Sequence, residues 1–332
     1  RKKIKMLVTY NGMLNGYLDD PELLSESSVR NAAEHVRSVA NQAGYQAECL
    51  PITDITRDIY SVKAFGADII FNLCEGYRDN PAMESNVAAL WELLEVPYTG
   101  NSPVTLSLSQ DKILVKRILS SNGILTPDYE VFTKSADKTK IPFPVIAKPS
   151  KEDASLGIRC DSVIYNNEQL KHKISVLLEQ FNQPVLVEKF IEGREFNLGI
   201  FGHNPPRLLP VSEIDFTRLG EEFPHITSYE AKWIEDHPMF QNTLSVCPAK
   251  ISCEIRKKLE ETALKVYALL NAKDYGRVDF RITKEEEIYV LEFNPNPDIS
   301  VDAGFSKALE AGGIKYIEFI DKLVESNLNG KS

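Results

Sequence analysis

Two short segments near the C-terminal end carry the polar residues best suited to chemistry. The segments 276–282 (GRVDFRI) and 288–294 (IYVLEFN) alternate polar and apolar residues on either side of a charged turn. Alternation of this kind, interrupted by a few polar residues, predicts a β-hairpin. We expect the turn to be centred between Glu285 and Glu286, and this centre fixes which residues of the two strands face each other.

Four polar side chains are then expected on one face of the hairpin, because Asp279 lies opposite Glu292 and Arg277 lies opposite Asn294. Two carboxylates and an amide suit Mg²⁺, a hard ion that completes its octahedron with water and phosphate oxygens. The arginine could stabilise an oxyanion or a phosphate. The same group would also suit a solvated hairpin surface with an ion pair, and spacing alone does not decide between the two.

A second candidate site lies at the ends of two other apolar strands. Lys148 follows the run 145–147 and precedes the loop 151–157, so its amine could neutralise a phosphate that the loop's N–H groups hold. The loop matches no glycine-rich phosphate motif, and a solvated surface lysine is the alternative. The segment 188–191 could present backbone groups to an adenine, with Glu195 on the ribose, or could be a strand that enters a charged turn.

Composition and motifs exclude several classes of protein. The net charge is −10 with no basic stretch, which argues against a nucleic-acid partner. The five cysteines are spread without a CxxC pair, so we expect reduced thiols and a cytoplasmic location. No apolar run is long enough to span a membrane, and the basic start does not lead into a signal peptide. Histidines without metal spacing and the lack of a GxSxG motif disfavour hydrolases that use a protein nucleophile.

The first third of the chain alternates strand and helix patterns, which predicts a parallel, doubly wound sheet. The loops 10–15 and 74–80 follow two of its strands and would face a ligand, because such sheets bind ligands at the carboxyl ends of their strands. The expected strands are 4–9, 45–50 and 67–73, and the expected helices are 29–43 and 83–94.

From Ser109 onward the pattern becomes mixed α+β. Ser109 is expected to cap a helix that ends at 122–123. The stretch 215–232 is expected to be irregular, and a hairpin and a helix complete the chain. The other expected strands are 128–132, 145–148, 185–189, 195–201 and 208–214, and the other helices are 168–181 and 252–271.

Taken in order, these segments resemble the ATP-grasp superfamily, in particular its D-alanine–D-alanine ligase branch. The resemblance spans about residues 67 to 325. No single block is specific, but a chance match over the whole ordered set is improbable. The blocks are 71–72, 96–100 (VPYTG), 111–112 with Lys116, 123–127 (GILTP), 148–150 (KPS), 188–189 (EK), Glu195, 229–232 (YEAK), 247–249 (CPA), 276–280 (GRVDF) and 292–294 (EFN).

The resemblance implies a three-domain α/β (α+β) ATP-grasp fold. An N-terminal doubly wound pre-ATP-grasp domain would cover 1–108, a central subdomain 109–191 and a C-terminal subdomain 192–332, with a lid loop at about 211–232. ATP would be gripped between the last two. The implied assembly is a homodimer.

The resemblance also assigns roles to residues. The activity it implies is ligation of a small-molecule carboxylate to an amine through an acyl phosphate, with ATP and two Mg²⁺ ions, or Mn²⁺ in their place. Lys232 would contact the transferring phosphate and Arg277 would stabilise the tetrahedral intermediate. Asp279, Glu292 and Asn294 would hold the metal ions. The implied ATP contacts are Lys112, Lys148, Ser155, Glu188, Lys189, Phe190, Ile191, Glu195, Lys232 and Phe280.

Departures from the family pattern cluster where the substrates would bind. The chain has 9–13 (TYNGM) in place of a GGxSxE motif, Glu75–Gly76 in place of His-Gly, and Ala154 and Trp233 in place of a serine and a tyrosine. We therefore expect a product other than D-alanyl-D-alanine, and a second substrate of cationic or polyhydroxy character. The candidate substrate residues are Glu75, Gly76, Trp233, Asp298, Ser300 and Asp302.

Two other functions stay open on the sequence. One is an ATP-grasp ligase of another carboxylate class. The other is a non-catalytic switch protein that only binds nucleotide. Retention of Arg277 and Lys232 argues against the switch, because nucleotide binding alone needs no oxyanion group.

Overall fold

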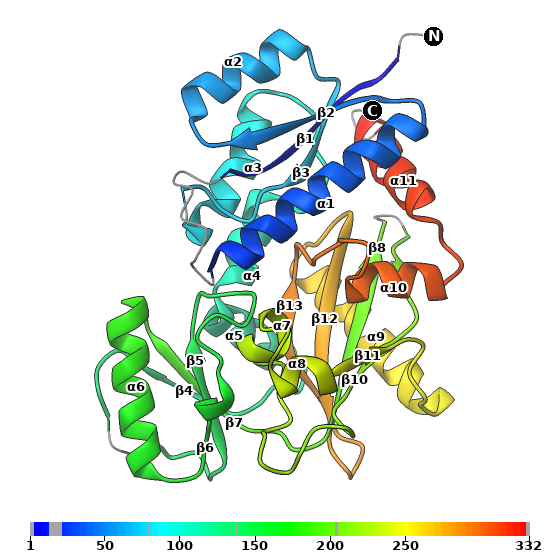
Figure 1. Ribbon diagram of the computed structural model, residues 1–332. Helices are drawn as coiled ribbons and strands as arrows, with labels where there is room; N and C mark the ends of the chain where they lie inside the picture. Colours follow the sequence, from blue (N-terminus) through cyan, green and yellow to red (C-terminus); the bar gives the residue numbers. More distant parts are fainter. Residues whose placement is uncertain (1–2, 13–21, 79, 137, 203–204, 330–332) are drawn as a thin grey trace.

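The computed structural model describes residues 3–12, 22–78, 80–136, 138–202 and 205–329, with side chains from 28 onward in the first helix. The chain forms three sheets, and Figure 1 shows the first at the top of the molecule and the other two below it. Within the part of the chain so described, no helix has the length and apolarity needed to cross a membrane.

The first sheet is parallel and covered on both faces, as predicted. Its strands β1 (Lys5–Asn11), β2 (Gln46–Ile52) and β3 (Ile69–Leu73) lie in the order β2-β1-β3. Because side chains alternate between the two faces along β1, its residues belong to two separate hydrophobic cores. One core includes α1 (Glu22–Gln42) and α11 (Tyr316–Asn329), and the other includes α2 (Ile55–Phe65) and α3 (Glu84–Leu93). Of the predicted loop 10–15, residues 13–15 lie outside the described residues.

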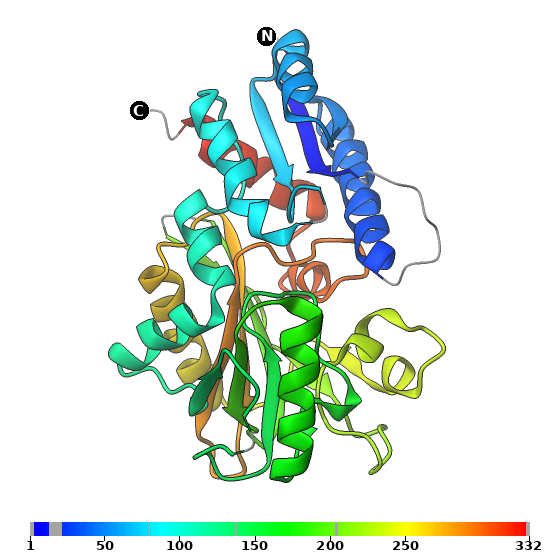
Figure 2. The ribbon, with the colours of Figure 1, turned by 90° about the vertical axis from the view of Figure 1, so that its left-hand side faces the viewer.

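The second sheet is antiparallel, and one long helix packs on it. The strand order is β4-β7-β5-β6, and the core lies between the sheet and α6 (Asn167–Phe181). Figure 2 shows α6 facing the viewer at the bottom of the molecule. The strands are β4 (Tyr129–Phe132), β5 (Val145–Pro149), β6 (Val163–Ile164) and β7 (Val185–Lys189).

Two helices lead into this sheet, and their boundary corrects one prediction. Ser109 lies inside α4 (Pro103–Gln110), so it does not cap the next helix. The cap of α5 (Lys112–Ser121) is Asp111, whose side chain accepts a hydrogen bond from the N–H of Leu114 at 3.0 Å. This cap fixes the position of Lys112, the first residue of the helix.

The third sheet carries the predicted hairpin. Its order is β11-β10-β8-β12-β13, with β9 also paired to β8, and α9 (Cys253–Leu269) and α5 cover one face. The predicted strand 208–214 is interrupted at Pro210, which lacks the N–H that a ladder needs. The strands are β8 (Arg194–Phe201), β9 (Arg207–Leu208), β10 (Ser212–Asp215), β11 (Leu244–Val246), β12 (Tyr275–Ile282) and β13 (Ile288–Asn294).

Short helices complete the chain. They are α7 (Tyr229–Trp233), α8 (Pro238–Asn242), α10 (Gly304–Ala311) and the 3₁₀ turns Pro81–Met83 and Cys160–Ser162. The division into domains at 108 and 191 stays a prediction. In space, however, α11 packs on the first sheet, although the sequence places it at the end of the third unit.

Candidate active site

The free face of the third sheet brings the four predicted hairpin residues together. Asp279 pairs with Glu292 and Arg277 pairs with Asn294, as predicted. Nearer the turn the pairing shifts by one residue, because a β-bulge leaves Leu291 without a partner on β12. The turn is therefore centred on Glu285, and the bulge restores the predicted register at the site.

Asp279 is tied to its neighbours on the sheet. Both its oxygens accept from Arg277, at 2.6 Å from Nε and 2.8 Å from Nη2. Asn197 of β8 donates to Oδ1 at 2.7 Å. Burial and the nearby Glu292 raise the pKa of Asp279 against the opposing effect of Arg277.

Glu292 lies among cations. Lys112 Nζ is 3.9 Å from its Oε2 and also contacts Asp153 at 2.7 Å. Burial raises the pKa of Glu292, but the combined charges of Lys112, Lys148, Lys232 and Arg277 lower it to about 2. Four cations around one half-buried carboxylate favour a binding site over a solvated hairpin surface with a single ion pair.

Lys148 is held by a buried carboxylate. Its Nζ lies 2.5 Å from Glu188 Oε2, and Lys116 binds Oε1 of the same group. All three side chains are buried. Burial raises the pKa of Glu188, but the two lysines lower it by more, so the pKa of this carboxyl group lies below its usual value. Two buried lysines on one carboxylate leave a net positive charge, which a phosphate could neutralise, so Lys148 is no ordinary surface lysine.

The predicted adenine segment lies at the end of β7. The N–H of Lys189 donates to Asp128 O at 2.8 Å, and the N–H of Phe190 donates to Pro144 O at 3.1 Å. The Lys189 ammonium contacts Pro142 O at 3.1 Å. Those groups hold the segment in place, while Ile191 and Glu195 both contact Arg281 of β12.

Phe280 does not fit its predicted role. It is fully buried on the other face of β12, in the core beneath α9. Residues on one strand alternate between faces, so a contact of Asp279 with a ligand on the site face excludes the same for Phe280. We therefore correct the prediction that Phe280 contacts ATP.

The segment 216–228 packs on the loop that follows Lys148. Ser155 Oγ donates to Thr227 O at 2.9 Å, and the N–H of Tyr229 donates to Ile158 O at 2.8 Å. Trp233 Nε1 donates to Ala154 O at 3.0 Å. These bonds join the loop 151–158 to the segment 227–233 beside the residues predicted to bind the nucleotide.

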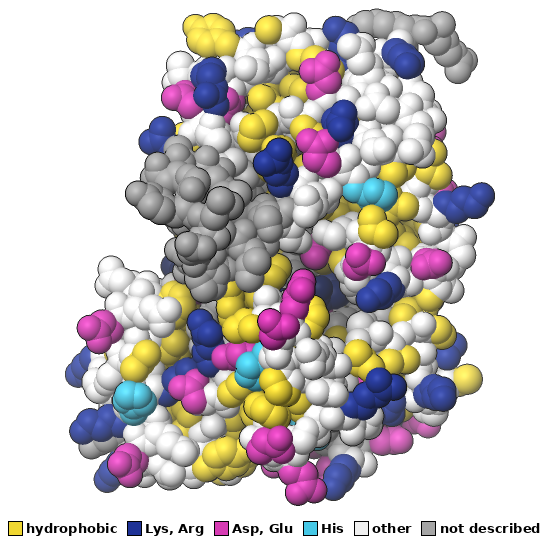
Figure 3. Space-filling model, viewed as in Figure 1, with side chains coloured by type: hydrophobic (Ala, Val, Ile, Leu, Met, Phe, Trp, Pro, Cys, Tyr) yellow, Lys and Arg dark blue, Asp and Glu magenta, His cyan; other side chains and the backbone are white. Residues whose placement is uncertain are grey.

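A cavity of about 650 Å³ lies where the three sheets meet. Arg277, Lys232 and Asn294 line it together with Trp233, Glu75, Gly76 and Asp298. Figure 3 shows side chains of both charges where the upper and lower parts of the molecule meet. The enclosing protein and the neighbouring Arg277 lower the pKa of Lys232.

Glu75, Glu84 and Asp298 form an acidic side of this cavity, and Glu84 is the one of the three that the sequence did not indicate. The surrounding protein and the neighbouring Glu84 and Asp298 raise the pKa of Glu75, although its side chain stays partly open to solvent. Burial likewise raises the pKa of Glu84 to about 8, although Asn296 donates to its Oε1 at 3.0 Å. Both residues line the cavity.

The remaining predicted substrate residues differ in position. Gly76 permits a close turn, since a Cβ there would lie 2.8 Å from Asn80 O. Ser300 donates its hydroxyl to Asp298 at 2.5 Å, so the two form a local pair. Asp302 is exposed and is not among the described residues that line the cavity.

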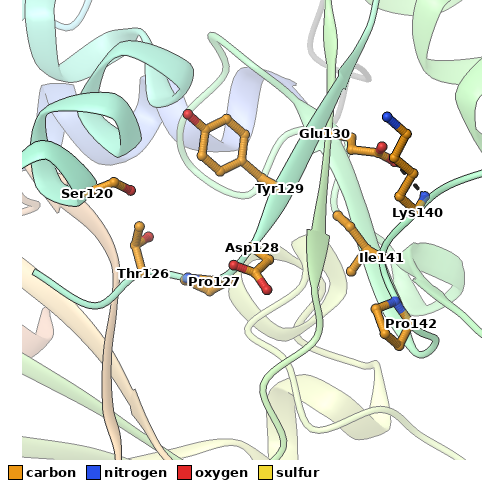
Figure 4. A pocket seen from close by; sticks show the side chains of 9 residues that line it. All are labelled: Ser120, Thr126, Pro127, Asp128, Tyr129, Glu130, Lys140, Ile141 and Pro142. Atoms are coloured by element: carbon orange, nitrogen blue, oxygen red, sulfur yellow. Dashed lines mark hydrogen bonds between the residues drawn. The ribbon is translucent and has the colours of Figure 1, made fainter.

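A smaller open pocket of about 380 Å³ lies beside β4, between the end of α5 and the segment 139–142. Figure 4 shows Glu130 directed toward Lys140, whose N–H donates to it at 3.0 Å. None of the predicted site residues lines this pocket.

The donor set at the hairpin fits Mg²⁺. Two adjacent carboxylates and an amide supply the oxygen ligands that Mg²⁺ prefers, and Glu292 is ionised. Within the described ranges no three His, Cys, Asp or Glu residues gather as a metal site by themselves. Mg²⁺ does not need three, because it takes one or two carboxylates and completes its shell with phosphate and water.

Similarity to solved structures shows which fold the chain has. The D-alanine–D-alanine ligase from Bacillus anthracis complexed with ATP aligns over 99% of this chain and 98% of that one, with a TM-score of 0.77 and 21% identity. A second structure of the same ligase aligns with a TM-score of 0.76. The fold is therefore that of an ATP-grasp ligase.

Sequence comparisons show the family to which the chain belongs. The model of the D-ala D-ala ligase C-terminus matches residues 118–325. The D-alanine–D-alanine ligase of Carboxydothermus hydrogenoformans is 30% identical over 84% of this chain and 87% of its own. The uncharacterized protein y4sG of Sinorhizobium fredii is 29% identical over 77% of this chain and 74% of its own. The chain belongs to the D-alanine–D-alanine ligase family.

Proposed function

We propose that this protein is an ATP-dependent ligase that joins a carboxylate to an amine through an acyl phosphate. The cluster at the hairpin edge of the cavity carries the proposal. Lys112, Lys148, Lys232 and Arg277 together lower the pKa of Glu292 to about 2, and Arg277 and Lys232 also line the cavity. Such a concentration of cations suits the charge of a triphosphate and of the oxyanions formed from it.

Each side chain has a place in the proposed reaction. A carboxylate oxygen of the substrate attacks the γ-phosphorus, the new O–P bond forms, and the bond to ADP breaks. Lys112, Lys148 and Lys232 would balance the phosphate charge. Magnesium held by Asp279, Glu292 and Asn294 would supply further charge neutralisation at the phosphates.

The second step joins the amine. Its nitrogen attacks the acyl carbon, which forms the C–N bond and a tetrahedral oxyanion next to Arg277. The carbonyl then re-forms, the C–O bond to the phosphate breaks, and inorganic phosphate leaves with the proton that the nitrogen loses. The acyl phosphate hydrolyses readily, so water must be kept out. We assign this task to the predicted lid loop at about 211–232, whose middle part 216–228 lies between β10 and α7 and packs on the loop 151–158 beside the site.

We further propose that D-alanyl-D-alanine is not the main product. Asp298 lines the cavity and would repel the carboxylate of a second amino acid, while the raised pKa values of Glu75 and Glu84 favour protonated groups that can donate hydrogen bonds to a polar acceptor. An acceptor of cationic or polyhydroxy character suits these groups better. A homodimer and the alternative carboxylate classes stay predictions.

Trapping of the acyl phosphate tests the ligase. Purified protein is incubated with ATP, Mg²⁺, hydroxylamine and a panel of carboxylates that includes D-alanine, and ADP and hydroxamate are quantified. We expect hydroxamate in equal amount to ADP for at least one carboxylate. We expect Glu292→Ala to lower the rate by about 100-fold, as loss of a group that stabilises transition-state charge does.

The matched control is Glu213→Ala, which removes a carboxylate that pairs with Arg194 on the same sheet. It should leave the rate unchanged. ATP binding without turnover for any carboxylate would refute the ligase and favour the switch. Formation of D-alanyl-D-alanine as rapidly as in the bacterial ligases would refute the altered specificity alone.

A further inference from the structure

Arg281 is a buried arginine that the proposed chemistry does not use. It follows Asp279 by two residues on β12, so both side chains lie on the site face, and it is 3% exposed. Its guanidinium donates to Glu195 Oε2 at 2.7 Å and 3.2 Å, to Ile191 O at 3.1 Å and to His225 O. One side chain therefore joins the adenine segment, β8 and the segment 216–228.

Two aromatic rings enclose this guanidinium. It lies 5.2 Å from the ring centroid of Phe190 and 5.8 Å from that of Phe216. Phe216 in turn stacks on His225 at 5.4 Å. The positive charge is thus paired, hydrogen-bonded and packed against rings, which is how a buried arginine avoids the cost of lost hydration.

The contacts of Arg281 leave Glu195 with little acceptor capacity. Thr227 donates to its Oε1 at 2.8 Å, and Arg281 donates twice to Oε2. A carboxylate offers about four acceptor positions, so one remains on Oε1. Glu195 could accept from one hydroxyl of a bound sugar, and could not take both hydroxyls of a ribose in a bidentate manner.

We propose that Arg281 is the positioning residue for recognition of the nucleotide sugar. It holds Glu195 by two hydrogen bonds, turns the one open acceptor position toward a single ribose hydroxyl, and binds the segment 216–228 beside it. The inference rests on the proposed function, because it assumes that ATP binds at this site.

Binding measurements with altered sugars test the proposal without any knowledge of the ligase substrates. The affinities for ATP, 2′-deoxy-ATP and 3′-deoxy-ATP are measured by titration calorimetry with Mg²⁺. We expect the wild-type protein to bind ATP about tenfold more tightly than one of the two deoxy forms, because that form lacks one hydrogen bond to a charged group. The other deoxy form should bind as tightly as ATP. The ratio of the affinity for ATP to that for the weaker deoxy form is the quantity compared between variants.

Arg281→Met should reduce this ratio toward one. Arg281→Lys keeps the buried charge, which protects the fold, but a single ammonium cannot span Glu195, Ile191 and His225 together, so the ratio should fall there too. Arg194→Met is the matched control, since it removes an arginine that binds Glu213 in a bidentate manner on the exposed part of the same sheet. It should leave the ratio unchanged.

The outcomes separate the two proposals. If the variants bind all three nucleotides more weakly but keep the wild-type ratio, Arg281 has only a structural role and the inference is wrong. Equal binding of all three nucleotides by the wild-type protein would also overturn it. A wild-type protein that binds no ATP would overturn the proposed function as well.

Limited proteolysis gives a second readout. Arg218 is exposed in the segment 216–228 and is a trypsin site. Loss of the bonds from Arg281 should accelerate cleavage after Arg218 at least several-fold relative to Arg194→Met, as identified by fragment mass. An unchanged cleavage rate would show that Arg281 does not hold this segment.

Discussion

Two carboxylates at the acidic side of the cavity ionise well outside their usual range. Burial is the main cause for Glu84, whose pKa is raised to about 8, whereas Glu75 is more exposed and its pKa is raised by its protein surroundings and by the neighbouring carboxylates. Glu84 is 8% exposed and receives one hydrogen bond from Asn296, which only partly offsets the loss of hydration. In the folded protein Glu84 therefore binds its proton more tightly than an exposed carboxyl group does.

This pKa shift predicts how stability depends on pH. A carboxyl group whose folded pKa exceeds its unfolded value binds more protons when folded, so the protein loses stability as the pH rises between the two values. Glu84→Gln removes that loss and keeps an acceptor for Asn296. Since one pKa unit is worth about 1.4 kcal/mol, the shift from 4.5 to about 8 means that the variant should exceed the wild-type protein by several kcal/mol, up to about 5, at about pH 9 and equal it at about pH 5.

Urea unfolding at the two pH values measures this difference. Glu285→Gln is the control, because Glu285 is exposed in the hairpin turn and should change neither value. A difference between Glu84→Gln and wild type that is the same at both pH values would show that burial of Glu84 does not suppress its ionisation.

Among the elements, the N-terminus of α5 links helix formation to the site. Asp111 caps this helix, and the next residue is Lys112, whose amine contacts Asp153 and lies near Glu292. Asp111→Ala should destabilise the protein by ~1 kcal/mol, as loss of a helix cap does. It should also weaken ATP binding several-fold, because the first turn that holds Lys112 would fray.

The chain offers a matched helix for comparison. Asp54 caps α2 in the same way, with a 3.0 Å bond from Arg57 N, and α2 covers the first sheet away from the hairpin. Asp54→Ala should cost a similar amount in thermal or urea unfolding and leave the affinity for ATP unchanged. Equal effects of both variants on ATP binding would argue against a specific link through Lys112.

Periodicity predicted the hairpin site because its polar residues lie close together in the sequence. Opposed pairs and same-face neighbours follow from strand geometry, and both pairs of the cluster are confirmed. The same rule would have indicated Arg281, two residues beyond Asp279, in place of Phe280. The bulge at Leu291 had no signal in the pattern, and the predicted register was correct because the bulge compensates for the position of the turn.

Other elements depend on contacts that local patterns do not contain. The helices α2 and α4 were not predicted, and the cap was assigned to Ser109 where Asp111 serves. Glu84 and Asn296 lie 212 positions apart in the sequence and meet only in the folded chain. The acidic side of the cavity could therefore be predicted only for Glu75 and Asp298, from their departure from the family pattern.

At the scale of the whole molecule, the end of the chain returns to its beginning. Phe319 of α11 is fully buried, with ring centroids 5.7 Å from Phe201 and Phe305 and 5.9 Å from Tyr275. These rings belong to a core that also includes β1 and β3 of the first sheet. Asn101 adds polar links, donating to Tyr275 O at 2.8 Å and Pro295 O at 2.6 Å. The first and third sheets therefore share one core and hold the cavity between them.

A shared core predicts that the two sheets unfold together. Phe319→Ala should lower the free energy of unfolding by about 3–5 kcal/mol, whereas Phe319→Leu, which conserves most of the volume, should cost less than about 1.5 kcal/mol. Trp91 is buried in the first sheet's other core, so its fluorescence in a Trp233→Phe background reports on that sheet, while far-ultraviolet circular dichroism reports on all three. We expect the two urea transitions to coincide in each protein and to shift together in Phe319→Ala. A fluorescence transition that moves to lower urea alone would mean that the first sheet unfolds independently, and the cavity would then be formed by a contact much weaker than a common core.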